Sequence, residues 1–268
     1  MMRCRSVRTP RAGSLLLSVL CLSTLCLSTL GCAESVINSD GVGGLGGLGG
    51  AESSGGIAGS GGIAGSAGSG AEPEVKPTAC AGELAVFVVS VRDHEFGTGQ
   101  DVGQDHFPEL VLGPPHGAGK TSGSTDHVVS LGDGGFVELG FGDYAIVDAP
   151  GPDFIVFENA FFVGGDPSLP YAEFGQVSVS QDGAEWTSFP CQTEDLPYDS
   201  CAGWHPVLAN PDTNDLDPTD PEVAGGDPFD LADLGLPWAR YVRIDDVVDD
   251  KELTFDLDAV ALAHPGCF

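Results

Sequence analysis

"VSVSQDGAEWTSF", residues 177–189, holds two short runs of strand-forming residues on either side of Gln181-Asp182-Gly183. Alternation with a period of two is typical of a strand with one buried face. An Asp-Gly pair between two such runs is a signal for a tight hairpin. The segment therefore predicts two antiparallel strands joined by a short turn.

The chain from Cys80 onward continues in the same manner. Short runs rich in β-branched and aromatic residues are separated by Gly, Pro and Asp, and "GDGG" at 132–135 predicts a second hairpin. No stretch sustains a helical period, and "DLADL" at 230–234 could form one or two turns at most. We predict an all-β fold for residues 80–268, an antiparallel β-sandwich with long loops at its ends. The remaining expected strands cover residues 83–91, 127–131, 136–141, 153–157, 240–244 and 254–262.

The N-terminus has the pattern of an export signal. Four arginines precede an apolar run at residues 15–30, which closes on Gly31-Cys32. "TLGC" at 29–32 resembles a bacterial lipobox, although Thr29 stands where leucine is usual. The resemblance implies a lipoprotein signal peptide at residues 1–31 and lipidation of Cys32, with an uncleaved membrane anchor as the alternative. In both cases we expect the rest of the chain in the bacterial cell envelope, lipid-anchored at the outer membrane or cell surface.

Residues 32–79 are expected to form a tether. They are built from Gly, Ser and Ala, with the near-repeat "SGGIAGSGGIAGS" at 54–66. This composition cannot bury enough apolar surface to order itself. A disordered linker of this length spans about 35–40 Å.

The charge balance restricts the partners. The net charge is −30, and phosphate binding depends on lysine and arginine. We therefore expect no nucleic-acid partner, membrane contact only through the lipid anchor, and a monomer. Divalent cations are the natural counterions of such a chain.

Four cysteines lie beyond the leader and the lipidation site: Cys80, Cys191, Cys201 and Cys267. An even number in an exported domain predicts two disulfides. The spacing favours Cys191 with Cys201 across a short loop, and Cys80 with Cys267 between the first and last strands. Zinc binding is the alternative, but no CxxC or HExxH spacing supports it.

The strand pattern also carries a resemblance. The opening segment and "ARYVRIDD" at 239–246 resemble the signatures of galactose-binding-like, jelly-roll-like sandwiches, the group that includes discoidin modules. Five ordered motifs resemble a family of exported bacterial cell-surface proteins and lipoproteins, and they imply the fold and the extracytoplasmic location but no settled activity. The motifs are "VVSLGDGGFVELGF", "GPDFIVFENAF", "VSVSQDGAEWTSF", "AGGDPFDLADLGL" and "FDLDAV".

Motifs for catalysis are weak. "GPPHGAGKT" at 113–121 fails as a phosphate loop because Pro114 stands where glycine is required. No GxSxG motif is present, and the histidines show no pairing suited to a nucleophile and its base. Glycoside hydrolysis needs two carboxylates, which Glu158 or Glu173 beside an aspartate could supply.

Calcium is the stronger interpretation of the acids, because Ca²⁺ takes six to eight oxygen ligands from such loops. In "FDLDAV" (255–260), a strand would place Asp256, Asp258 and Val260 on one face, where the two aspartates repel unless a cation lies between them. "GGDPFDL" supplies Asp227 and Asp230, whereas "DTNDLDPTD" at 212–220 is a weaker match. The alternatives are ion pairs with Arg240 and Arg243, or solvent.

"GPDFIVFENAF" (151–161) adds further candidates. Both faces of this run are apolar, which predicts a central strand with polar ends. Asp153 lies at its start, and Glu158 and Asn159 lie at its end, where we expect metal ligands. The alternative is that Asn159 forms a turn which Glu158 caps.

We therefore expect a non-enzymatic binding or adhesion module, stabilised by Ca²⁺, with a glycan or a surface protein as partner. Glycans are favoured by analogy with the fold. The alternatives are a carbohydrate-active hydrolase with paired carboxylates and a structural envelope lipoprotein.

Overall fold

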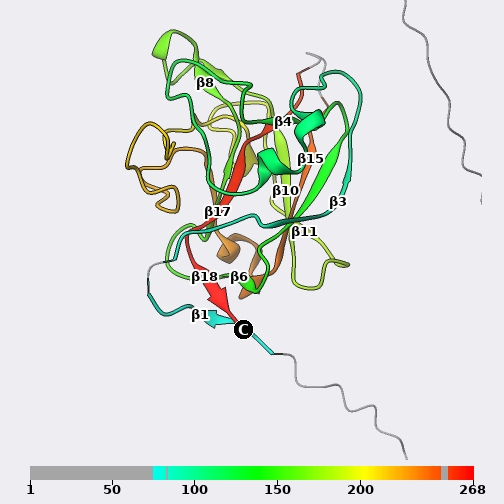
Figure 1. Ribbon diagram of the computed structural model, residues 1–268, viewed down its shortest axis with the longest axis vertical. Coiled ribbons are helices and arrows are strands. Elements are labelled where there is room, and N and C mark those ends of the chain that lie inside the picture. The colour runs from blue at the N-terminus through cyan, green and yellow to red at the C-terminus, as the bar shows by residue number, and fades with distance from the viewer. Residues whose placement is uncertain (1–74, 83, 249–252) are drawn as a thin grey trace, which may run out of the picture. The chain divides into compact units, whose positions relative to one another are not determined.

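The computed structural model describes residues 75–82, 84–248 and 253–268 (Figure 1). The predicted signal peptide, Cys32 and the linker as far as residue 74 lie outside the described residues. No helix in the described part of the chain has the length and apolar character needed to cross a membrane.

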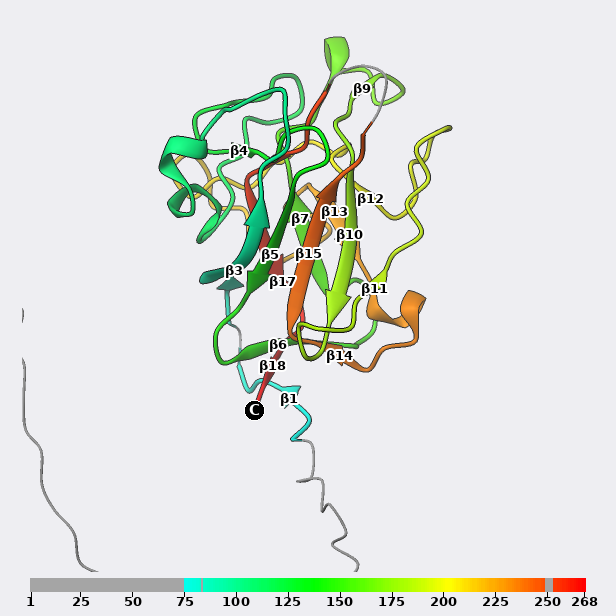
Figure 2. The same ribbon diagram turned by 90° about the vertical axis from the view of Figure 1, so that its right-hand side faces the viewer.

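The domain is all-β, and within its sheets all the described strands pair in antiparallel orientation. The largest sheet has six strands in the order β11-β10-β15-β5-β3, and β12 also pairs with β10 (Figure 2). These strands are β3 (Ser90–Glu95), β5 (Phe136–Gly140), β10 (Gly175–Ser180), β11 (Thr187–Ser188), β12 (Cys201–Ala202) and β15 (Tyr241–Asp246).

A four-stranded sheet with the order β13-β7-β17-β2 supplies the other side of the core. Its strands are β2 (Val86–Phe87), β7 (Phe154–Phe157), β13 (Asp227–Phe229) and β17 (Ala259–Leu262).

The smaller sheets lie at the ends of the domain (Figure 1). One has the order β1-β18-β6-β14, and two have a single pair each, β16-β4 and β8-β9. Their strands are β1 (Thr78–Ala79), β4 (Val129–Ser130), β6 (Tyr144–Val147), β8 (Phe161–Phe162), β9 (Pro170–Tyr171), β14 (Trp238–Ala239), β16 (Asp256–Leu257) and β18 (Pro265–Cys267). Short 3₁₀ turns are η1 (Gln104–His106), η2 (Glu109–Val111), η3 (Val163–Gly165) and η4 (Leu231–Leu234).

The main hydrophobic core lies between the two large sheets, as in a sandwich. Val177 and Val179 of β10 share it with Phe154 and Val156 of β7, all of them fully buried. The opposite face of β7 packs into a second cluster through Ile155 and Phe157. The prediction of a central strand with two apolar faces is confirmed.

The hairpin predicted at 177–189 is confirmed, because Val179 of β10 pairs with Thr187 of β11. The hairpin predicted at "GDGG" is wrong. A turn forms there, with the Gly135 N–H donating to the Gly132 carbonyl at 2.7 Å. However, β4 pairs with β16 and β5 pairs with β3 and β15. The turn redirects the chain between sheets instead of folding it back on itself.

The strand predicted at 254–262 is interrupted at Asp258, which separates β16 from β17. Asp258 is an extra residue between the two strands, and it shifts the alternation of buried side chains by one position. Val260 therefore joins Phe255 and Leu257 in the main core. The prediction that Val260 shares a face with Asp256 and Asp258 is therefore wrong.

Both predicted disulfides are present. The disulfide between Cys80 and Cys267 connects the residue that follows β1 to strand β18, and its Cα–Cα distance is 5.1 Å. The disulfide between Cys191 and Cys201 has a Cα–Cα distance of 4.5 Å. Strand β1 lies inside the range predicted as linker, since Thr78 pairs with Cys267. Disulfides persist in oxidising compartments, which indicates an extracytoplasmic location.

Candidate metal centre

The predicted metal ligands separate along strand β7. Glu158 and Asn159 follow its last residue, whereas Asp153 precedes its first. A strand rises about 3.3 Å per residue, which puts the two ends of β7 too far apart for one ion. The candidate ligands therefore form distinct groups and not one site.

Three buried carboxylates gather beyond the end of β7. Glu158, Glu173 and Asp256 each offer an oxygen, and these three oxygens lie within 4.8 Å of one another. Asp256 comes from β16, and Glu173 lies two residues before β10. We call these residues the Glu158 cluster. Such a cluster could hold a metal ion.

Neighbouring polar groups orient Asp256. The Ser130 hydroxyl in β4 donates a hydrogen bond to one oxygen of Asp256, and the Asn159 amide nitrogen donates to the other at 3.1 Å. Asn159 thus contributes a donor to the cluster, where we had expected an oxygen ligand. Burial is the largest cause that raises the pKa of Asp256, and the hydrogen bonds from Ser130 and Asn159 oppose it.

Glu158 has unsatisfied bonding capacity. Its Oε1 is buried and has no hydrogen-bond partner among the described residues. Burial, followed by the charges of Glu173 and Asp256, raises the pKa of Glu158 well above its ordinary value. A carboxylate in this position requires either a proton or a cation.

A cavity of about 10 Å³ lies against Glu158, Asn159 and Asp258. Its other wall comes mainly from the loop of residues 116–124, including His116. The volume is that of a single water molecule or ion. Both oxygens of Asp258 accept the His116 N–H, at 2.8 and 3.1 Å, and burial raises the pKa of Asp258 to about 7.

The carboxylate at the start of β7 is fully engaged with the protein. Asp153 accepts hydrogen bonds from the Ala149 N–H at 3.0 Å and the Leu231 N–H at 2.8 Å, and it contacts His264 Nδ1 at 2.9 Å. Asp148 and Asp230 each have an oxygen near it. Asp230, however, also caps η4 by accepting the Ala232 N–H at 2.8 Å.

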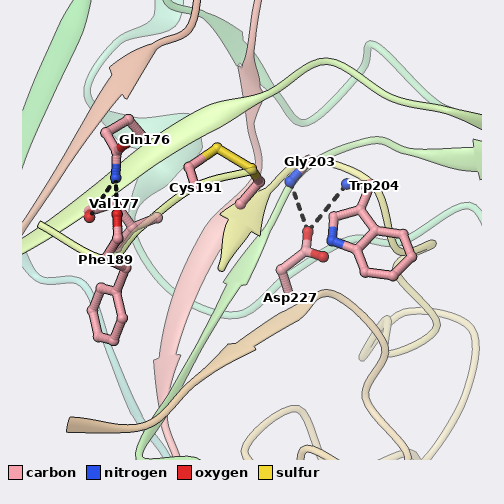
Figure 3. Close-up of a disulfide and its surroundings, with 8 residues drawn as sticks. Gln176, Val177, Phe189, Cys191, Gly203, Trp204 and Asp227 are labelled. Carbon is pink, nitrogen blue, oxygen red and sulfur yellow. Dashed lines mark hydrogen bonds between the residues drawn. A yellow bond between two sulfur atoms is a disulfide. The ribbon is translucent and has the colours of Figure 1, made fainter. Parts of the chain in front are cut away.

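Asp227 is engaged in a similar way (Figure 3). One oxygen accepts the Gly203 N–H at 2.7 Å and the Trp204 N–H at 3.2 Å. The other oxygen contacts His205 Nδ1 at 2.7 Å. Gly203 has φ of 93°, and a Cβ there would overlap the Glu173 carbonyl oxygen. Asp227 thus organises the loop after β12 and is not part of the Glu158 cluster.

The arginine partners proposed for the acids are bound elsewhere. Arg243 pairs with Asp245 at 2.6 Å and with Glu138 at 3.1 Å. The Arg240 guanidinium lies over the Phe268 ring at 4.8 Å. These two arginines therefore do not form the ion pairs with Asp256 and Asp258 that were the alternative to a metal.

Sequence reasoning considered Glu173 only for hydrolysis and did not assign it to the metal site. No local signal indicated this role, because β10 belongs to the six-stranded sheet and pairs with neither β7 nor β16. His116 and the 116–124 loop were overlooked because "GPPHGAGKT" was considered only as a phosphate loop.

A comparison of the chain with models of known protein families finds no match, and a comparison with curated proteins finds none either. The structure therefore supports an all-β domain with several antiparallel sheets and no narrower family.

Proposed function

We propose that this chain is an envelope-anchored, non-enzymatic binding or adhesion module that is stabilised by calcium and recognises glycans through its end loops. The observation that carries the proposal is the Glu158 cluster, in which a buried carboxylate oxygen has no protein donor among the described residues. A bound cation would neutralise the cluster and fix the loops around it.

The donor set favours calcium over other metals. The cluster offers carboxylate oxygens, which suit hard cations, whereas zinc sites usually contain cysteine or histidine. Mg²⁺ usually keeps several of its waters. The adjoining cavity of about 10 Å³ has room for only one water molecule or ion, so it does not suit a hydrated Mg²⁺. Calcium accepts flexible geometry and backbone carbonyl ligands, which the 116–124 loop can provide.

Glycan binding is supported by the sandwich architecture and by the resemblance of its motifs to galactose-binding-like modules. Exposed loops at the end of a rigid sandwich are the usual location of a binding site. Hydrolysis is the weaker alternative because Glu158 and Glu173 are buried. A scissile bond cannot approach these carboxylates in the described conformation.

The deciding experiment passes glycans and native envelope polysaccharide over the immobilised full chain in the presence of calcium. Retention without cleavage is the expected result. Release of new reducing ends would show that the chain is a hydrolase and not a binding module. A chain that neither retains nor cleaves any carbohydrate would be a structural envelope component instead.

Lipid anchorage through Cys32 is a separate part of the proposal. Cys32→Ser should abolish labelling with a radioactive fatty acid and should leave an unprocessed precursor. Normal processing of that variant would contradict the lipobox.

A further inference from the structure

The 116–124 loop faces two ways. Gly117 and Ser124 line the cavity beside Glu158, whereas Lys120, between them in sequence, lines a separate surface pocket. Backbone hydrogen bonds join the middle of the loop to neighbouring segments. The Gly119 N–H donates to the Val207 carbonyl at 3.1 Å, and the Phe162 N–H donates to the Lys120 carbonyl at 2.8 Å.

The surface pocket, which we call the Lys120 pocket, has a volume of about 250 Å³. This is slightly below the range of about 300–1,000 Å³ that is typical for drug-sized ligands. Much of its wall is rigid and apolar, since prolines have no side-chain freedom to lose on binding. These apolar residues are Phe162, Pro206, Leu208, Pro221 and Pro228.

Three polar side chains also line the pocket: Lys120, His205 and Glu222. Lys120 forms no ion pair with any described residue, and His205 uses only Nδ1, which contacts Asp227 at 2.7 Å. The Trp204 ring lies 3.5 Å from the His205 ring, measured between centroids, and helps to hold it. The pocket therefore presents a pre-positioned imidazole, an ammonium donor and a carboxylate acceptor.

We propose that the Lys120 pocket binds one sugar ring of a glycan. A pyranose has apolar C–H faces and an edge of hydroxyl groups that both donate and accept hydrogen bonds. The apolar walls suit the faces, and Lys120, His205 and Glu222 suit the hydroxyl edge. This inference rests on the proposed glycan-binding function and gives it a location.

The same loop couples the sugar to the cation. An ion held by Glu158 would restrain the residues on both sides of Lys120, so less freedom remains to be lost when the sugar binds. Calcium should therefore strengthen sugar binding although the two ligands do not touch. By linkage, the sugar should strengthen calcium binding by the same factor.

The test uses the full chain and the carbohydrate that the retention experiment selects, titrated by calorimetry in calcium. Lys120→Ala should weaken binding about tenfold, the value of one charge-assisted hydrogen bond. Glu222→Ala should weaken it several-fold. The matched control is Lys76→Ala, because Lys76 is exposed and precedes β1, which lies at the opposite end of the domain from β8 (Figure 1).

Unchanged affinity in both pocket variants, with retention by the wild type intact, would overturn the Lys120 pocket and leave the proposed function standing. A wild type that retains no carbohydrate would overturn the proposed function itself. Binding equally strong in EGTA and in calcium would overturn the coupling through the loop. Equal melting temperatures for the variants and the wild type exclude misfolding as the cause of any loss.

Discussion

Strand β7 has a buried carboxylate beyond each end, and the two carboxylates are satisfied in different ways. Asp153 receives two backbone N–H groups and contacts a histidine. Glu158 lies among two other carboxylates and keeps one buried oxygen without a partner in the described structure. Both side chains are at most 1% exposed, so burial does not distinguish them.

The two ends differ in the number of protein donors that each carboxylate receives, and not in the density of acids around it. N–H donors favour the anion, and at Asp153 the donors from Leu231, His264 and Ala149 oppose the rise in pKa that burial causes. An acid surrounded by other acids is stable only with a proton or a cation. On this comparison, the Glu158 end is the one where a cation would supply what the protein donors do not.

The largest effect should come from the Asp153 end. Asp153→Ala leaves the buried Leu231 N–H and the partly buried Ala149 N–H without an acceptor, and we expect a loss of about 3–5 kcal/mol in the free energy of unfolding. Urea unfolding should give the same loss in EGTA and in calcium. The control Asp148→Ala removes an exposed acid of the same group and should change stability by less than about 0.5 kcal/mol. A loss that is larger in calcium than in EGTA would make Asp153 a calcium ligand and would contradict the distinction between the two ends.

The next effect should come from calcium itself. At a free concentration a hundredfold above Kd, bound calcium adds about 2.7 kcal/mol to the free energy of unfolding. For a domain of this size the melting temperature should rise by about 5–10 °C over its value in EGTA. Sodium at equal ionic strength should not reproduce the rise.

Glu158→Gln provides the contrast. It should abolish the response to calcium, and in EGTA it should be at least as stable as the wild type because it relieves repulsion within the Glu158 cluster. If chelators leave the melting temperature unchanged and the purified protein contains no metal, protons and not calcium neutralise these acids.

A smaller effect should appear in the dependence on pH. Burial raises the pKa of Asp258 from 3.8 to about 7, so the folded state holds this proton more tightly than the unfolded state. The stability is then complete below the unfolded pKa and is lost as the pH rises toward 7. In EGTA, the free energy of unfolding should fall by at least about 1.4 kcal/mol between pH 5 and pH 8, the equivalent of one pKa unit.

Asp258→Asn keeps an acceptor for the His116 N–H and should make this fall in stability smaller. Calcium should reduce the part of the fall that comes from Glu158 and Asp256, whose pKa values are also raised, because a cation competes with protons for the Glu158 cluster. Stability in EGTA that rises over the same interval would contradict the assignment.

The sequence was sufficient for much of the fold because local periodicity reports which face of a strand is buried. The alternation at 177–189 and the apolar faces of β7 were predicted correctly. The hairpin at "GDGG" was not, because β4 pairs with β16, more than a hundred residues away, and no local pattern shows a distant partner. The interruption at Asp258 was hidden for the same reason, since a break in alternation needs the neighbouring strands to reveal it.

The candidate site could be predicted only in part. Glu158 and Asp256 were selected because acids that interrupt apolar strands require neutralisation. Asp153 and Asp227 met the same criterion, yet each is satisfied by backbone N–H groups that come from loops distant in sequence. The identity of a donor depends on tertiary structure, and the sequence therefore could not separate the two kinds of acid.

The smallest effect should come from the exposed acidic loop at 212–220. Asp217 accepts hydrogen bonds from the Thr219 N–H at 2.9 Å and the Thr219 hydroxyl at 2.7 Å, so its charge is used within a turn at the surface. Asp217→Asn keeps an oxygen acceptor for that turn and should change stability by less than about 0.5 kcal/mol. The rise in melting temperature on adding calcium should be the same as in the wild type. Because this loop carries four acids in nine residues, a lost calcium response in Asp217→Asn would show that acid density matters after all. It would also overturn the distinction drawn at the two ends of β7.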